Sequence, residues 1–148
     1  MKYMEYDDLY FDILDITAGP NDDPYFSSLP EAAQCLHFVA LFDMEIQNGG
    51  LQQFFVNCGA AYAVRISQNL RIIGLPEIAD LYDDFINRHG IDVSCLSGFS
   101  TKTIDEFTSL TTLYPFDEFD DAYIKLWKMR NFNKVMLEYA NAHPEAFQ

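Results

Sequence analysis

Residues 45–59 of this chain read EIQNGGLQQFFVNCG. A helical pattern surrounds the double glycine, which breaks helices and lets two backbones approach closely. We therefore expect one helix to end at residues 48–50 and a short helix carrying Phe54 and Phe55 to follow over residues 51–56. Asn57, Cys58 and Gly59 are expected to end that short helix.

The same stretch sets four polar side chains between apolar ones, namely Glu45, Asn48, Gln53 and Asn57. Polar groups that a fold buries are nearly always hydrogen-bonded. One interpretation is a structural hydrogen-bond cluster between helices, with Asn48 near a helix end and Glu45 accepting backbone N–H groups. The other is a recognition or catalytic pocket. The residues alone leave both interpretations open.

Helical periodicity extends outward from this stretch in both directions. Before it, apolar residues recur at helical spacing over residues 6–16, and Ser28 to Glu31 forms a capping box that predicts a largely buried helix reaching about Gln47. After it, the spacing predicts helices over residues 61–73, 76–90 and 103–113, and two more on either side of a break at Asn131. No strand, repeat or linker is predicted. Residues 1–148 are therefore expected to form a single all-α domain, a compact bundle of about seven helices.

The charge balance is strongly acidic, with 23 acidic against 9 basic residues, a net charge of −14 and a pI near 4.2. Binding to a nucleic-acid backbone needs a basic patch, so we expect no direct contact with nucleic acid. Such a surface attracts basic proteins, although acidity also serves solubility alone. The candidate partner-binding residues are the acidic groups Asp7, Asp8, Asp12 and Asp15, then Asp80, Asp83 and Asp84, then Asp117, Glu118, Asp120 and Asp121.

The sequence contains no set of residues typical of catalysis. Its three histidines lie far apart, and it lacks the motifs of serine hydrolases, P-loop proteins and dinucleotide-binding enzymes. Its three cysteines form no C-x-x-C pair, which predicts neither a disulfide framework nor a zinc site. We therefore expect a non-enzymatic protein with no cofactor and no metal.

The expected location is the cytoplasm. The chain begins Met1-Lys2-Tyr3-Met4-Glu5 and lacks the basic region and apolar core of a signal peptide. Its longest apolar-leaning stretch, residues 35–42, is far shorter than the roughly 20 residues that a membrane span needs. No association with a membrane is therefore expected.

The central stretch also resembles the signature of a known family. The matching residues are Glu45-x-x-Asn48-Gly49-Gly50-x-x-Gln53-Phe54-Phe55-x-Asn57-x-Gly59, and Leu51 stands where the signature usually has an aromatic residue. The family is a bacterial domain family of largely unknown function, whose best-described member is a DNA mimic. In that member, a dimer, an acidic surface resembles duplex phosphates and occupies the DNA-binding face of a transcription factor. The resemblance implies a similar role here, with a DNA-binding transcription regulator as partner and a homodimer as the assembly.

Three functional hypotheses follow. The leading one is an acidic, non-enzymatic protein-binding domain that mimics DNA. A domain of this length is roughly 38 Å across, a span of duplex with about 22 phosphates, so a net charge of −14 must be clustered to imitate DNA. The alternatives are an immunity or antitoxin-type protein that neutralises a basic toxin, and a ligand-binding or enzymatic pocket near Glu45 to Asn57.

Overall fold

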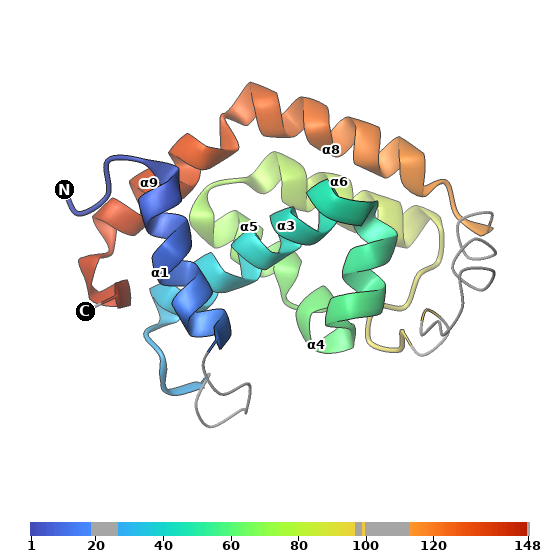
Figure 1. Ribbon diagram of the computed structural model, residues 1–148. Helices are drawn as coiled ribbons and strands as arrows, with labels where there is room; N and C mark the ends of the chain where they lie inside the picture. Colours follow the sequence, from blue (N-terminus) through green and yellow to red (C-terminus); the bar gives the residue numbers. More distant parts are fainter. Residues whose placement is uncertain (19–26, 97–98, 100–112, 148) are drawn as a thin grey trace.

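A computed structural model of the protein describes residues 1–18, 27–96, 99 and 113–147. Within these residues every regular element is helical, which confirms the predicted all-α bundle of about seven helices (Figure 1). The elements are α1 (Tyr6–Ala18), α3 (Glu31–Cys58), α4 (Ala60–Ala63), α5 (Ile66–Ile73), α6 (Pro76–Arg88), α8 (Phe116–Arg130), α9 (Phe132–Ala142) and the 3₁₀-helix η2 (Pro144–Phe147).

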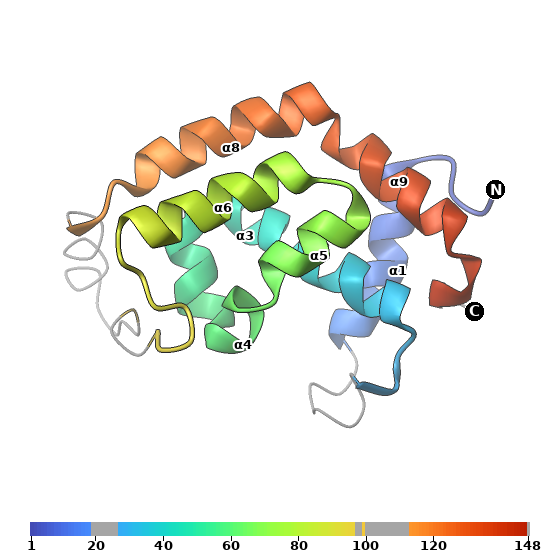
Figure 2. The same ribbon diagram turned by 180° about the vertical axis from the view of Figure 1, so that it is seen from behind.

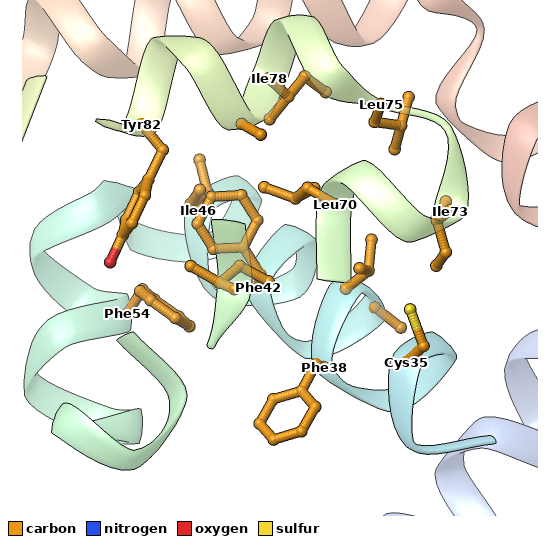
Figure 3. Close-up of a cluster of buried hydrophobic side chains, with 14 of the residues drawn as sticks. Cys35, Phe38, Phe42, Ile46, Phe54, Leu70, Ile73, Leu75, Ile78 and Tyr82 are labelled. Atoms are coloured by element: carbon orange, nitrogen blue, oxygen red, sulfur yellow. The ribbon is translucent and has the colours of Figure 1, made fainter. Parts of the chain in front are cut away.

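Helix α3 is the central element, because apolar residues surround most of its circumference. Its side chains Leu36, Val39 and Phe42 are fully buried. Figure 3 shows Phe42 and Ile46 of α3 beside Leu70 of α5 and below Ile78 of α6. Helices α1, α5, α6, α8 and α9 all contact α3 or one another around this core, so α3 is the scaffold that positions the central stretch.

Helix α8 runs along the outside of the bundle, against α6 and α3 (Figures 1 and 2). It ends at Asn131, whose φ of 51° places it in the left-handed region that ends helices, and α9 starts at the next residue. The predicted break at Asn131 is therefore confirmed. Asparagine tolerates this conformation better than other non-glycine residues.

The predicted start of the central helix is wrong in its detail. Helix α3 begins at Glu31 with Pro30 at the N-cap, so Ser28 does not cap it. Proline holds φ near its fixed value, here −53°, and the extended ψ of 143° makes Pro30 the last non-helical residue. Proline has no side-chain oxygen, so the capping box is not formed.

The helix predicted over residues 61–73 is two helices, α4 and α5. Val64 and Arg65 keep near-helical backbone angles, but the Arg65 N–H bonds to the Tyr62 carbonyl, three residues back, at 3.1 Å. This tightened turn changes the direction of the chain. The stop signal at residues 19–20 and the helix predicted over residues 103–113 lie outside the described residues, except for Leu113.

The two ends of the chain lie together beside α1 and α9 (Figure 1). The Tyr3 N–H donates to Asn141 Oδ1, and Asn141 Nδ2 donates to the Tyr3 carbonyl, both at 2.8 Å. Lys2 also donates to the carbonyl of Phe147. Among the helices of the described ranges, none combines the length and apolar character that crossing a bilayer requires.

Candidate functional site

The double glycine of the central stretch forms a break inside α3. Gly50 has φ 83° and ψ −179°, whereas the residues on both sides of it are helical. A Cβ atom at Gly50 would lie 2.3 Å from Oδ2 of Asp120, so the close approach of α8 also requires glycine there. The predicted interruption is confirmed, but the chain resumes its helix at once, without a loop.

Asp120 of α8 caps the second segment of α3. The break leaves the first N–H groups of this segment without helical partners. The Leu51 N–H donates to Asp120 Oδ1 at 3.0 Å. The prediction that Glu45 accepts backbone N–H groups at this point is therefore wrong, since the acceptor comes from another helix. Burial raises the pKa of Asp120 to about 6, and the Leu51 hydrogen bond opposes this shift.

Glu45 binds side-chain amides instead. It is a buried charged residue, with only 8% of its surface exposed. Oε2 accepts hydrogen bonds from Gln53 Nε2 at 2.8 Å and from Asn57 Nδ2 at 2.9 Å. We call these three residues the Glu45 cluster. It joins the two segments of α3 across the break, as the structural interpretation of the stretch expects.

The remaining residues of the stretch are divided between core and surface. Phe54 and Phe55 are buried, and Phe54 packs edge-on against Phe42 with ring centroids 4.9 Å apart. Gly49 leaves room for Gln53, whose Oε1 would lie 1.9 Å from a Cβ atom there. Gly59, with φ 73°, ends α3. Asn48 is exposed and lies apart from the Glu45 cluster, on a groove described below.

The acidic residues of α6 are paired within the fold. Arg71 of α5 lies 2.8 Å from both Asp80 and Asp83, and Arg88 lies 2.5 Å from Asp84. Asp83 also accepts a hydrogen bond from the Ser67 hydroxyl at 2.8 Å. Each of the three predicted acidic candidates on α6 therefore lies beside an arginine of the same protein. The positive charge of that arginine weakens the electrostatic field of the carboxylate at the surface.

The acidic residues of α1 are paired only in part. The Tyr3 hydroxyl donates to Asp12, and Lys2 Nζ lies 3.4 Å from the same carboxylate. Asp7, Asp8 and Asp15 are exposed. None of these three forms an ion pair with another described residue.

Three acidic residues of α8 are more exposed than their half-buried neighbour Asp120. Asp117, Glu118 and Asp121 occupy the first turns of α8 and are exposed. Over the part of the chain that the structure describes, they have no ion-pair partner. Figures 1 and 2 show the start of α8 and helix α1 toward opposite ends of the molecule. The unpaired carboxylates therefore form two separate groups rather than one patch.

The described residues hold no group of three or more histidine, cysteine, aspartate and glutamate side chains placed to bind a metal ion. Cys35 is buried, Cys58 is half-buried, and burial raises the pKa of each thiol to about 12. Such thiols are poor nucleophiles at neutral pH, because the thiolate is the reactive form.

The sequence analysis missed one feature, a groove of about 630 Å³ between α1, α3, α8 and α9. Asp43 lies in it, half-buried, and accepts hydrogen bonds from the Tyr123 hydroxyl at 2.5 Å and from Gln47 Nε2 at 3.3 Å. The available signal was a charged residue within the apolar run of α3, since a carboxylate on a buried helix face needs partners. The aromatic residues that supply the groove walls come from distant segments and could not be assembled from the sequence.

Comparison with known proteins gives one match. A family model described as DMP19-like protein matches residues 27–143 of the chain, a range that includes the whole of α3 and extends to the end of α9. No match was found to a curated protein or to a solved structure.

Proposed function

The chain belongs to the DMP19-like protein family, and from this premise we propose that it is an acidic, non-enzymatic protein-binding domain that acts as a DNA mimic. The proposed partner is a DNA-binding transcription regulator, whose basic DNA-binding face the acidic surface would occupy. The resemblance of the central stretch to the family signature, with a DNA mimic as its best-described member, supports the same role.

The observation that carries the proposal is the group of unpaired carboxylates on α8. Asp117, Glu118 and Asp121 are exposed, lie within about one helical turn and are not neutralised by a described residue. Phosphates of duplex DNA present the same features, namely exposed anions at short intervals. The unpaired acids of α1 would add a second point of contact toward the other end of an extended partner surface.

The burial of the Glu45 carboxylate favours a structural role for the family signature. The carboxylate that a catalytic pocket would use already accepts two amide hydrogen bonds. The fold and the proposed activity are then carried by different residues, the Glu45 cluster at the break in α3 and the exposed acids of α8.

The first step of the test is capture of partners from a lysate of the source cell at low salt, with elution in a salt gradient and identification by mass spectrometry. Binding between oppositely charged surfaces weakens strongly between about 50 and about 500 mM salt. A captured regulator is then purified, and the protein is tested for displacement of a labelled duplex from it. Displacement is the expected result; a regulator that binds DNA and this protein simultaneously would contradict mimicry.

Two triple variants with equal charge changes sharpen the test. Asp117→Asn with Glu118→Gln and Asp121→Asn removes unpaired acids, whereas Asp80→Asn with Asp83→Asn and Asp84→Asn removes paired ones. We expect the α8 triple variant to lose about tenfold or more in displacement, and the α6 triple variant to lose about twofold or less. Equal losses would mean that net charge alone drives binding. Recovery of a basic toxin or nuclease instead of a regulator would favour the immunity-type alternative.

A further inference from the structure

The groove between α1, α3, α8 and α9 has walls formed by aromatic rings. Tyr6 and Tyr10 of α1 stack with ring centroids 6.0 Å apart, and Trp127 of α8 stacks on Phe132 with centroids 6.1 Å apart. The rings of Tyr6, Tyr10 and Trp127 line the groove and are half-buried, so each still presents part of its surface to it. Aromatic faces carry negative potential and attract cations.

Two carboxylates lie in the same groove. Asp43 of α3 directs Oδ1 to the Tyr123 hydroxyl and to Gln47, which leaves Oδ2 without a hydrogen bond of standard geometry from a described residue. Burial raises the pKa of Asp43, and the donors around it oppose this shift, the nearby indole N–H of Trp127 among them. That indole N–H is buried and makes no hydrogen bond of standard geometry within the described residues. Asp7 is exposed at the edge of the groove.

Hydrogen-bond donors and aromatic rings line the groove together with Asp43, and the lining also includes a cation. Lys128 lines the groove from α8, is exposed and forms no ion pair within the described ranges. Two carboxylates against one ammonium leave the groove net negative, which is complementary to a cationic ligand. A planar guanidinium suits it better than an ammonium, because it stacks on aromatic rings and binds a carboxylate through two N–H groups.

We propose that this groove binds the guanidinium group of an arginine side chain on a protein partner, with Asp43 and Asp7 as counter-ions and the rings of Tyr6, Tyr10 and Trp127 as walls. The inference rests on the proposed function, since a surface that binds DNA phosphates presents arginine side chains. It adds to that function a specific pocket between α1, α3, α8 and α9, whose lining does not include the outer acids Asp117, Glu118 and Asp121.

The test uses a small probe and a built-in reporter. Trp127 is the only tryptophan of the chain, so its fluorescence reports on the groove directly. The probe is the blocked tripeptide acetyl-Gly-Arg-Gly-amide, and the control is the same tripeptide with citrulline, a neutral isostere, in place of arginine. We expect a saturable change with the arginine peptide and no saturable change with the citrulline peptide. Equal responses to both would overturn the inference.

Charge variants test whether the groove binds a cation rather than an anion. Asp7→Asn is expected to weaken binding of the arginine peptide about threefold, whereas Asp8→Asn, the same change at an exposed neighbour outside the groove lining, leaves it unchanged. Lys128→Gln removes a like charge and is expected to strengthen binding about threefold. Weaker binding by the Lys128→Gln variant would show an anion site and overturn the inference.

Asp43→Asn tests the inner counter-ion, because the amide oxygen can still accept the Tyr123 hydrogen bond and keep the fold. We expect this variant to lose saturable binding while its melting temperature stays within a few degrees of the parent; unchanged binding would overturn the role of Asp43. The probe needs no regulator, so the groove and the DNA-mimic function can fail separately. Displacement of DNA that survives Asp7→Asn and Asp43→Asn would remove the groove from partner recognition and leave mimicry by α8 intact.

Discussion

Carboxylates at the break in α3 and on the outer face of α8 are used in opposite ways. At the break, Glu45 and Asp120 accept hydrogen bonds from amide N–H groups of the protein itself. On the outer face of α8, Asp117, Glu118 and Asp121 are exposed and have no ion-pair partner among the described residues. Acidic residues that look alike in the sequence therefore fall into two classes, those that hold the fold and those that remain free for a partner.

The largest effect is expected from crowding the break. Gly50→Ala forces a left-handed backbone on a residue with a Cβ atom and drives that atom into Asp120, so we expect a loss of at least about 3 kcal/mol in the free energy of unfolding. Chemical denaturation measures it. Gly59→Ala is the matched control, because Gly59 has a similar backbone conformation, φ 73° and ψ −169°, but open space around a Cβ atom.

The control should lose only the backbone contribution, about 1–2 kcal/mol. The difference between the two alanine variants then measures the approach of α8 to the break. Equal losses at both glycines would show that Asp120 moves aside freely, and the break would no longer serve as a close contact between α3 and α8.

A smaller loss is expected at the Glu45 cluster. Glu45→Ala leaves two side-chain amides without their acceptor, one of them half-buried, so we expect a loss of about 2 kcal/mol. Glu45→Gln is the control, because both amides bond to the same oxygen and a glutamine carbonyl can replace it. Thermal unfolding separates the two variants. A Glu45→Ala variant that melts like the parent would argue for a pocket rather than a structural cluster.

The helices could be predicted from the sequence because their apolar residues recur at helical spacing, and this signal is local. The break at residues 49–50 was predicted because glycine interrupts helices, and the break at Asn131 because the apolar residues change helical phase there; the left-handed backbone of Asn131 was not predicted. The capping box failed because Pro30, two residues after Ser28, starts the helix in its place. A proline inside a candidate capping box therefore outweighs the serine and glutamate that flank it.

The candidate site was predicted less completely, because the partners of its charged groups are distant in sequence. Asp120 lies 69 residues from Leu51, and Tyr123 lies 80 residues from Asp43. No periodicity connects such pairs. The sequence identified Asp120 as one of several acids at the start of a helix, but only the packing of α8 on α3 separates it from Asp121.

The smallest effect is expected from these two adjacent residues. The pKa of Asp120 is raised to about 6 in the folded protein, against about 3.9 for an unfolded aspartate. The fold therefore favours the protonated carboxyl, and its contribution to stability is present near pH 4 and lost as the pH rises through about 6. The substitution Asp120→Asn places a neutral amide at this position, which keeps an acceptor for the Leu51 N–H. Since Asp120 is partly exposed, we expect a gain of only about 1 kcal/mol at pH 8 and none near pH 4.

The adjacent variant Asp121→Asn is the matched control, because it makes the same change one residue along α8 on an exposed side chain. We expect it to alter the free energy of unfolding by no more than about 0.5 kcal/mol at either pH. Urea denaturation of the parent and both variants near pH 4 and pH 8 measures the comparison. A loss of stability in Asp120→Asn at pH 8 would mean that the charge of the cap, acting on the start of the second segment of α3, outweighs the cost of burying it. Equal responses of the two variants would remove the distinction between the inward and outward carboxylates of α8, and Asp120 would then join Asp117, Glu118 and Asp121 as a residue free to contact a partner.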